Sequence, residues 1–510
     1  MNKSMRTKLI VTVSLLTLLG SCSNWSSNWK PGKRGPSSDQ SSSDILSYSQ
    51  SVVDKVATRE LNVSNCQVEL DQLIKYYTEL PKNISLDVMK SGGQDLLAAS
   101  FEARLALHSS LEILPLECKG KMKSLYLAMR LAEDFIGAHL YSDEQISASS
   151  IKYPEQAIPI YEGEKYHPYY VGAGIDPKAK FQFKNGDIMI TKGVSFVSST
   201  ISELATPKSV FSHIVFVHVD EKTGVASTIE SYVGKGVSIF SMEEALKNEN
   251  ARIVVLRPKD SVLAAKAANY MFDKVQRLKK NKKFIPYDYQ LDFSDNSKLS
   301  CEEVAYDAFK TMSEGKFIIP ELESEIKLDD PKFLERVGVK RGPMMVPTDM
   351  ETDSRFDLVL DWTDYRVIRD SWRKDALLGE MFHWIQDYDY RIYENATSIA
   401  AKVIWSTRYI PGLWNMMSRI SGIPVDFTKD VPNITVSTMA SLKTIGGILL
   451  NEANKADEEA FKKNGRWLLK NELGESLDRY RQTNPKELRK VFREKKKENL
   501  NSGLEESSAY

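Results

Sequence analysis

The sequence predicts an α+β fold, and three observations support this. Short β-branched runs separated by turn residues follow one another between residues 187 and 256, a pattern typical of strands. Two segments with apolar residues at steps of three and four come next, and this period indicates helices. Similar helical periods occur on both sides, over residues 45–150 and beyond residue 345. Strands followed by helices are typical of an α+β domain.

Residues 1–21 have the pattern of a secretory signal peptide. A basic start is followed by an apolar run from Leu9 to Leu19, shorter than the roughly 20 residues that a spanning helix needs. The ending Leu19-Gly20-Ser21-Cys22 resembles the lipobox of bacterial lipoproteins. The resemblance implies that Cys22 is acylated and inserted into a lipid bilayer, and the non-acidic Ser23 implies the outer membrane, facing the periplasm. A signal peptide with a coincidental cysteine is the alternative.

The charge balance excludes a dedicated nucleic-acid binder as a class. The 510 residues include 69 basic and 69 acidic side chains. Removal of the signal with Lys3, Arg6 and Lys8 leaves 66 against 69, a net charge of −3. Nucleic-acid binding needs a basic excess, so we expect no nucleic-acid partner. Residues 22–44, rich in Ser with Pro and Gly, are expected to form a flexible tether.

Residues 45–150 are expected to form a helical unit without evident chemistry. One predicted helix face carries Leu125, Met129, Ala132 and Ile136. Cys66 and Cys118 both fall near predicted helix ends, and in an oxidising periplasm they can pair. The chain-entropy model assigns roughly 4 kcal/mol to a disulfide that closes a loop of this length. Two buried thiols are the alternative.

Residues 151–345 are expected to form the central domain. It begins with a loop rich in Pro, Gly and Tyr, near residues 153–180. The predicted strands are Asp187–Thr191, His213–Asp220, Val225–Tyr232, Gly236–Phe240 and Arg252–Leu256. Two helices follow. The first carries Ala264, Ala268, Met271, Val275 and Leu278 on one face, and the second runs from Ser300 to Met312.

Residues 346–510 are expected to be a helical C-terminal region with a charged tail. Its basic cluster between Arg489 and Lys497 is interleaved with glutamates, which favours a solvated helix face over a site for an anionic partner. The stretch Ala400–Val425 is amphipathic rather than spanning. It contains Trp405, Tyr409, Trp414, Met416 and Met417, interrupted by Lys402, Arg408 and Arg419. Core packing and a membrane-facing surface are both open for this stretch.

Cys301 is the cysteine left over if Cys22 carries lipid and the two N-terminal cysteines pair. Ser300 and Glu303 have the spacing of a capping box, so we expect a helix to begin at Cys301. A helix N-terminus carries partial positive charge and free N–H groups, which lower a thiol pKa and can stabilise an oxyanion. A buried structural cysteine is the alternative.

A cysteine nucleophile needs a base, and His213 is the candidate. It opens a strongly β-forming run, in which His218, five residues on, faces the opposite side of a regular strand. A third group is needed to orient the imidazole and stabilise its charged form. Glu230, on the next predicted strand, is the nearest candidate, while Glu203 and Asp220 lie in loop-like contexts.

The order of these segments resembles the YiiX/YebB-like cysteine hydrolases, which have a circularly permuted papain-like fold. They are relatives of the NlpC-type cell-wall amidases and of the lecithin:retinol acyltransferase group. The resemblance covers about residues 183–315 and rests on Gly186-Asp187-Ile188, Ser212-His213-Ile214, Glu230-Ser231, Pro286-Tyr287-Asp288-Tyr289 and Ser300-Cys301-Glu302-Glu303-Val304. The histidine strand precedes the cysteine helix, as in the permuted group. The resemblance implies an antiparallel barrel or sheet with a cysteine helix, here flanked by N- and C-terminal helical regions.

The resemblance implies that Cys301 is the nucleophile, His213 the base and Glu230 the acidic group behind it. Tyr287 matches an aromatic pocket position and Tyr289 is a second candidate, either as oxyanion donor or as packing. The chain departs from the Cys-Ser-Glu stretch common in the family, because Glu302 follows the cysteine. A carboxylate there can raise the thiol pKa and oppose the helix dipole.

The implied function is acyl transfer by a lipid-anchored envelope cysteine hydrolase of the amidase or peptidase type. The thiolate attacks a carbonyl, an acyl-enzyme forms, and water or another acceptor releases the product. The substrate is expected to be a peptide, an N-acyl compound or a lipid, and no metal or cofactor is expected. The alternatives are a lipid acyltransferase or thioesterase on the same fold, and a non-catalytic envelope lipoprotein that uses the fold for binding.

Overall fold

The computed structural model describes residues 47, 51–52, 54–55, 64–141, 169–172, 174–176, 181–247, 250–326, 333–334, 342–393, 395–421, 429, 431–489 and 492–494. The expected signal peptide, Cys22 and the expected tether lie outside the described residues. So do residues 495–510, the end of the charged tail.

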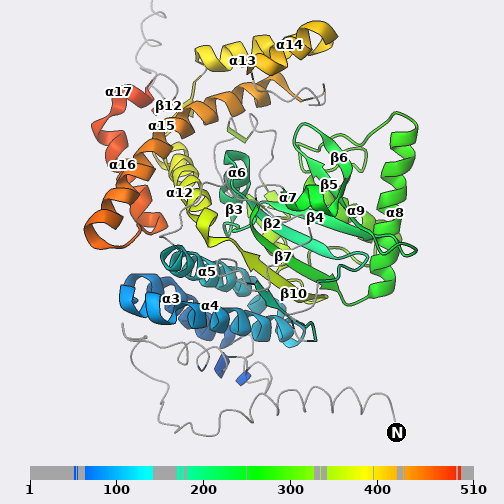
Figure 1. Ribbon diagram of the computed structural model, residues 1–510, viewed down its shortest axis with the longest axis horizontal. Coiled ribbons are helices and arrows are strands. Elements are labelled where there is room, and N and C mark those ends of the chain that lie inside the picture. Colours follow the sequence, from blue (N-terminus) through cyan, green and yellow to red (C-terminus); the bar gives the residue numbers. More distant parts are fainter. Residues whose placement is uncertain are drawn as a thin grey trace, which may run out of the picture. The chain divides into compact units, whose positions relative to one another are not determined.

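A seven-stranded antiparallel sheet lies at the centre of the described chain, in the order β1-β10-β7-β2-β4-β5-β6 (Figure 1). Its strands are β1 (Tyr169–Val171), β2 (Ile188–Gly193), β4 (His213–Val219), β5 (Ala226–Tyr232), β6 (Gly236–Ser241), β7 (Asn250–Pro258) and β10 (Phe356–Thr363). The predicted strands between residues 187 and 256 are confirmed, each to within two residues at its ends. The α+β class is confirmed, and the sheet is open rather than closed into a barrel.

Helices α8 (Ser261–Lys280) and α9 (Cys301–Met312) pack on one face of the sheet. Alternate residues of β4 point to this face, so Ile214 and Phe216 join the same apolar cluster as Val304 of α9. Val215 and Val217 point to the other face, where they pack with residues of α7 (Met242–Lys247). The second predicted helix is confirmed, and it begins at Cys301.

Strand β10 lies beyond the domain boundary expected at residue 345. It pairs with β7 along Phe356–Thr363 and with β1 at its other edge, so the sheet is completed by residues after the cysteine helix. The boundary at residue 345 was placed where the sequence pattern changes from strand-like to helical. Strand β10 lies after that change and is flanked by helical sequence on both sides, so it was included in the helical region. Strand β1 likewise falls in the stretch expected to be a loop, because three residues are too few to show a period.

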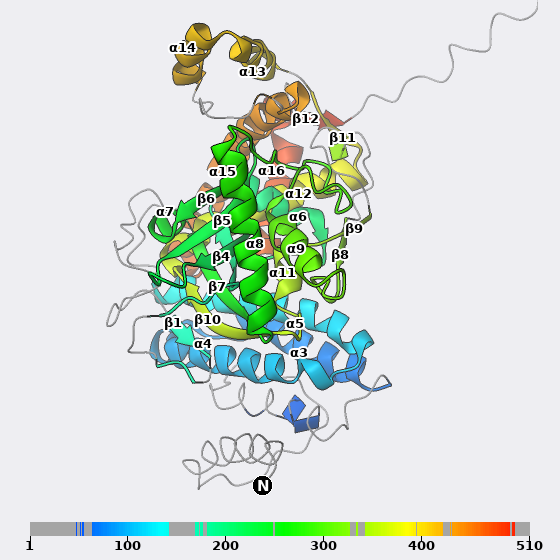
Figure 2. The same cartoon turned by 90° about the vertical axis from the view of Figure 1, so that its right-hand side faces the viewer.

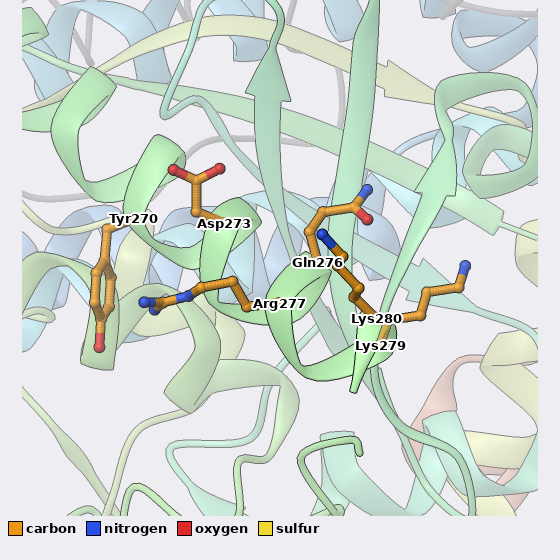
Figure 3. Close-up of a pocket in the computed structure, with 6 residues that line it drawn as sticks. All are labelled: Tyr270, Asp273, Gln276, Arg277, Lys279 and Lys280. Carbon is orange, nitrogen blue, oxygen red and sulfur yellow. The ribbon is translucent and has the colours of Figure 1, made fainter. Parts of the chain in front are cut away.

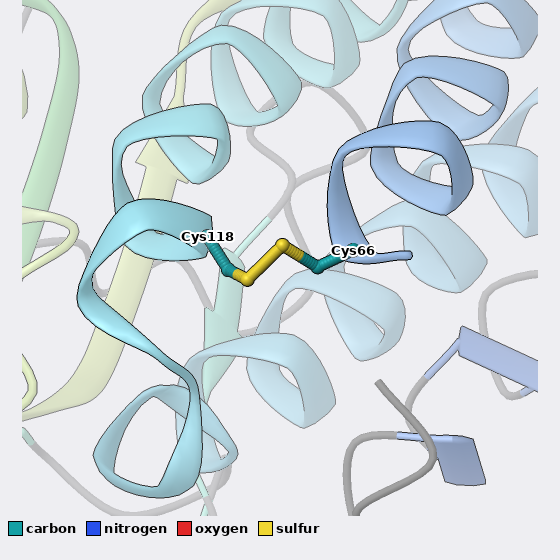
Figure 4. Close-up of a disulfide and its surroundings, with 2 residues drawn as sticks. All are labelled: Cys66 and Cys118. Atoms are coloured by element: carbon teal, nitrogen blue, oxygen red, sulfur yellow. A yellow bond between two sulfur atoms is a disulfide. The ribbon is translucent and has the colours of Figure 1, made fainter. Parts of the chain in front are cut away.

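The N-terminal helical unit consists of α3 (Cys66–Asn83), α4 (Leu86–Ser109) and α5 (Leu116–Leu140). A disulfide joins Cys66, the first residue of α3, to Cys118 in the first turn of α5 (Figure 4). The Cα atoms of the two cysteines are 5.9 Å apart, within the usual range for a disulfide. The predicted pairing is therefore confirmed.

Buried charges join this helical unit to the sheet. We call Arg104, Arg130, Glu133, Glu351 and Asp361 the arginine cluster; each side chain is at most 5% exposed. Asp361 of β10 accepts from both arginines, at 2.7 Å from Arg104 Nη1 and 2.9 Å from Arg130 Nη1. Burial alone raises the pKa of Asp361, but the two arginines outweigh it and lower the pKa to about 2.

The region expected to be helical after residue 345 contains strand β10, but the described chain beyond β10 is mostly helical, and its longest helices are α12 (Tyr365–Asp387), α15 (Asn433–Asn464) and α16 (Lys470–Thr483). Asp457 of α15 pairs with Arg373 of α12 at 2.8 Å, and also with Arg369. Helices α13 (Ala396–Ser406) and α14 (Pro411–Ser421) are joined by the short helix η4 (Thr407–Tyr409). Among the described residues, no helix combines the length and apolarity needed to cross a bilayer.

The remaining elements are short. They are η1 (Leu111–Ile113), α6 (Phe196–Leu204), α11 (Pro347–Met350), α17 (Pro485–Leu488), and two small sheets made of β3 (Ala205–Thr206), β8 (Ser324–Ile326) and β9 (Gly342–Met344), and of β11 (Tyr390–Ile392) and β12 (Phe492–Glu494).

Candidate active site

Cys301 is a buried free thiol at the first residue of α9. The Glu303 carboxylate accepts the backbone N–H of Ser300 at 2.7 Å, the contact expected of the capping box. The helix therefore begins where the sequence predicts, and the N–H groups of its first turn lie beside the thiol.

The segment before α9 is fastened to the ends of β5 and β6. Ser231 of β5 donates its hydroxyl to the Leu299 carbonyl at 2.6 Å, and Leu299 donates its N–H to the Pro286 carbonyl at 3.0 Å. The N–H of Val237 in β6 donates to the Ile285 carbonyl at 2.9 Å. These bonds fix the loop between α8 and α9, and with it the position of Cys301, against the sheet.

His213 and Glu230 are hydrogen-bonded, Nε2 to Oε2, at 2.9 Å. Tyr232 donates its hydroxyl to the same carboxylate at 2.6 Å, and Thr228 donates to the other oxygen at 2.5 Å. The Tyr232 ring also stacks on the imidazole, with centroids 4.7 Å apart. Glu230 is buried, while 16% of the His213 side chain is exposed. The imidazole is thus held from two sides and is still reachable from solvent.

The other candidates for the orienting acid are occupied elsewhere. Glu203 is paired with Lys208 at 2.6 Å and with Lys470. Asp220 accepts from the backbone of the turn that follows β4, including the N–H of Thr223 at 2.8 Å. Of the acids considered from the sequence, Glu230 is therefore the one that contacts His213.

His218 belongs to a different environment from His213. Its ring stacks on Phe272 of α8, with centroids 3.8 Å apart and planes 11° apart. Burial lowers the pKa of His218, partly against its hydrogen bond with Asn269. The prediction that the two histidines face opposite sides of the strand agrees with this placement.

The Cys301 thiol lies next to the start of the histidine strand. The backbone N–H of Ile214, the residue after His213, is directed at the sulfur. The ladder between β4 and β5 ends at Phe216 and Ile229, so this N–H lies outside the paired part of the two strands. Within the described chain, no direct hydrogen bond joins the thiol to the imidazole. The ring nitrogen that remains for proton exchange is Nδ1, because Nε2 is bonded to Glu230.

Burial raises the pKa of the Cys301 thiol well above its ordinary value, and the Glu302 carboxyl adds to the rise. The N–H groups of Ile214 and of Cys301 itself lower the pKa, but by less than burial raises it. The lowering expected from the helix N-terminus is therefore wrong in its net direction. The effect expected of Glu302 has the right sign. The sequence does not show that the thiol is 2% exposed, and burial dominates.

Two buried carboxyls follow the thiol. Within the described chain, Glu302 Oε2 and Glu303 Oε1 have no hydrogen-bond partner. Burial raises the pKa of Glu302, and it raises that of Glu303 to about 8 against the bond from Ser300, with Asp288 adding to the rise. Glu303 is therefore mostly protonated at neutral pH. Acidic residues in a first turn are common as dipole partners, so the sequence did not identify this pair as buried acids.

Tyr287 lies beside the nucleophile and Tyr289 next to Tyr287. Burial raises the pKa of Tyr287 well above its ordinary value, followed by the charges of Cys301 and Glu302, so the hydroxyl stays protonated. The ring of Tyr289 is 5.1 Å from that of Tyr287, and its hydroxyl accepts the Gly234 N–H at 3.2 Å. Tyr287 is therefore the better placed of the two to donate to a bound oxygen.

A pocket of about 290 Å³ lies between α9 and the loop before it, and it is lined in part by Leu299, Glu303 and Tyr306. Leu299 and Glu303 are each two residues from Cys301 in the sequence. A larger, open pocket of about 670 Å³ lies on α8 and is lined by Tyr270, Asp273, Gln276, Arg277, Lys279 and Lys280 (Figure 3). Its side chains project from one helix and include no cysteine, serine or histidine, so we place the candidate site at Cys301.

Among the described residues, no group of three or more His, Cys, Asp or Glu side chains is arranged to hold a metal ion. Comparison of the chain with protein families, curated proteins and solved structures finds no match.

Proposed function

We propose that this protein is a cysteine hydrolase of the amidase or peptidase type, with a permuted papain-like fold and a lipid anchor at Cys22. The observation that carries the proposal is the hydrogen bond between His213 and Glu230, together with its position beside the thiol. Ile214 follows His213 in the chain, and its backbone N–H is directed at the Cys301 sulfur. The chain order of histidine strand, acid strand and cysteine helix supports the permuted arrangement. The anchor places the enzyme in the bacterial envelope, at the outer membrane.

The reaction begins with a neutral thiol, because the pKa of Cys301 is raised. His213 takes the thiol proton through Nδ1 while the sulfur attacks the carbonyl carbon of the substrate. The C–S bond forms as the carbonyl electron pair moves to oxygen. Glu230, held by Tyr232 and Thr228, stabilises the imidazolium that results.

The oxyanion has two donors in reach of the nucleophile. One is the backbone N–H of Cys301 at the helix N-terminus, and the other is the hydroxyl of Tyr287. The intermediate collapses when His213 returns its proton to the leaving nitrogen or oxygen. Water, deprotonated by His213, then attacks the acyl-enzyme, and the released acid and the free thiol complete the cycle.

A lipid acyltransferase or thioesterase is the second candidate function. It uses the same residues, with a lipid alcohol or thiol replacing water as the acceptor. The observation that favours this second function is the group of exposed apolar side chains on α13 and α14. The buried core that contains the tryptophans of the same two helices contacts Tyr289 of the candidate site.

The pair is tested by alkylation of Cys301. We expect iodoacetamide to label Cys301, with the peptide identified by mass spectrometry, and His213→Ala to slow labelling at least roughly tenfold. His218→Ala is the matched control, because it removes a histidine from the same strand that stacks on α8. Labelling that is indifferent to His213 contradicts the catalytic proposal and favours a binding module.

The substrate is sought by a turnover screen of muropeptides, N-acyl amino acids and phospholipids, with Cys301→Ala as the inactive control.

The lipid anchor is tested separately by incorporation of labelled palmitate. Cys22→Ser is expected to abolish this incorporation. Labelling that persists in Cys22→Ser contradicts a lipid-bearing Cys22.

A further inference from the structure

Exposed apolar side chains gather on α13, η4 and α14. Five of the fourteen large apolar residues that are exposed in the described chain lie within eighteen residues here. They are more than half exposed, and they are Ile399, Val403, Tyr409, Ile410 and Met416, which we call the hairpin surface. Apolar residues concentrated in this way mark an interaction surface, whereas single ones are ordinary.

The inner side of the same helices has a core of its own. Trp405 and Trp414 are buried there, with rings 5.3 Å apart, and they pack with Val431 and with Val436 of α15. The core packing left open from the sequence is therefore observed for the two tryptophans, while other side chains of the same stretch are exposed. Its tryptophans pack inward, and the hairpin surface faces outward. Both views show α13 and α14 on the outer side of α15 (Figures 1 and 2).

The charged residues within the segment that carries the hairpin surface are all positive. Between Glu394 and Asp426 the sequence contains Lys402, Arg408 and Arg419 and no acidic residue, in a protein that is 27% charged. The guanidinium of Arg408 lies over the Tyr409 ring at 4.4 Å and over the Trp405 ring at 4.7 Å. Apolar and aromatic side chains flanked by cations, without acids, are typical of helices that lie in a bilayer interface.

A second basic segment, residues 277–284, lies a few residues before Tyr289 in the chain. The end of α8 and the residues after it carry five exposed cations and then the half-exposed Phe284; the cations are Arg277, Lys279, Lys280, Lys282 and Lys283. No acidic residue occurs between Asp273 and Asp288. Tyr289 packs against the Trp405–Trp414 core. Lys283 is six residues from that contact, at most about 20 Å of extended chain.

From these observations we infer that the hairpin surface and the basic segment 277–284 dock together on a bilayer that carries anionic phospholipid headgroups. The apolar side chains of the hairpin surface enter the interface between headgroups and acyl chains, while the lysines and arginines bind the phosphates. Tyr289 packs against the Trp405–Trp414 core and its ring lies 5.1 Å from that of Tyr287, so docking brings the candidate site towards the lipid surface. The inference goes beyond the proposed hydrolysis, and its test does not need catalysis.

The test measures sedimentation of the full chain with vesicles. All proteins carry Cys22→Ser, so that no acyl chain contributes and the same N-terminus is present throughout. We expect binding to mixed phosphatidylcholine–phosphatidylglycerol vesicles that exceeds binding to pure phosphatidylcholine and weakens at high salt. Changing Ile399, Val403 and Ile410 together to serine is expected to lower the partition coefficient at least roughly tenfold.

The matched control changes Ile113, Val225 and Val262 to serine. These are one isoleucine and two valines, exposed to 52%, 63% and 64%, against two isoleucines and one valine in the test variant, where Ile399, Val403 and Ile410 are exposed to 51%, 62% and 56%. The control is expected to bind as the parent does. Equal loss in both triple variants, or no preference for phosphatidylglycerol, overturns the inference. A parent that self-associates through the hairpin surface in analytical ultracentrifugation, and ignores vesicles, overturns it as well.

Discussion

At the scale of single residues, Glu302 decides how the candidate nucleophile is activated. Its carboxyl lies against the Cys301 thiol in a buried environment, and it raises the thiol pKa together with burial. A resting thiolate–imidazolium pair is therefore disfavoured, and the proton has to move as the substrate is attacked.

Removal of the Glu302 charge is expected to make the thiol more reactive. In Glu302→Gln the pKa of Cys301 falls because the neighbouring carboxyl charge is gone, so alkylation at neutral pH rises roughly three- to tenfold. The measurement is the rate of iodoacetamide labelling against pH. Glu314→Gln, which removes an exposed carboxyl just beyond the other end of α9, is the control and should leave the profile unchanged. A slower reaction in Glu302→Gln would show that the carboxyl assists the thiol instead.

Cys301, His213 and Glu230 could be predicted from the sequence because each depends on a local pattern. The sequence itself contains a capping box at Cys301, a β-forming run that starts at His213, and an acid, Glu230, on the next predicted strand. Tyr232 and Thr228 were missed as partners of Glu230: the predicted strand puts all three on one face, but a shared face does not show which side chains are hydrogen-bonded. The sign of the thiol shift was missed because it depends on burial, which no local pattern reports.

At the scale of secondary-structure elements, the α3–α5 disulfide holds together a unit that also carries three of the five residues of the arginine cluster. The bond spans 52 residues, which include all of α4. Because α4 and α5 contribute Arg104, Arg130 and Glu133, loosening these helices exposes charges that were buried against β10. The disulfide thus supports the interface with the sheet as well as the helices.

Loss of this disulfide is expected to lower stability without abolishing the candidate site. The Cys66→Ala/Cys118→Ala variant should lose about 4 kcal/mol of unfolding free energy, because its unfolded chain is no longer closed into a loop. Thermal unfolding followed by circular dichroism checks this. Cys301→Ala, which removes the free thiol, is the control. An unchanged midpoint for the double variant would mean that packing alone holds α3 and α5.

The elements that the sequence predicted well are those with a full period, namely β2, β4 to β7, α8 and α9. Strand β10 was not predicted, although Phe356–Thr363 is rich in residues that favour strands. The reason is Asp361, which is buried in the structure but has a residue type that is usually exposed. The arginines that neutralise it lie more than 200 residues earlier. Pairing over such a distance leaves no local signal.

At the scale of the whole molecule, the arginine cluster makes stability depend on acid. The pKa of Asp361 in the folded protein is about 2, below its ordinary value. A carboxyl with a lowered pKa stabilises the fold above its unfolded pKa, and this contribution disappears as pH falls through the folded pKa. The window of loss is therefore about pH 4 to pH 2.

The unfolding free energy is accordingly expected to fall by roughly 2 kcal/mol across that window through Asp361 alone. Urea titrations at several pH values measure it. Asp361→Asn should be less stable at neutral pH and should lose less on acidification than the parent. Asp220→Asn is the control, since that aspartate also has a lowered pKa but is exposed. Parallel pH curves for the parent and Asp361→Asn would contradict the assignment.

The late position of β10 in the chain has a consequence for biosynthesis and for protein engineering. Cys301, His213 and Glu230 all emerge from the ribosome before the strand that covers one edge of β7. Until Phe356–Thr363 follows, the Ile253–Leu256 edge is unpaired, and an unpaired apolar edge is a template for aggregation. A catalytic fragment cut at residue 345 would keep every candidate residue and leave that edge permanently open. The smallest soluble fragment therefore has to extend past residue 363 and include the N-terminal helices whose arginines neutralise Asp361.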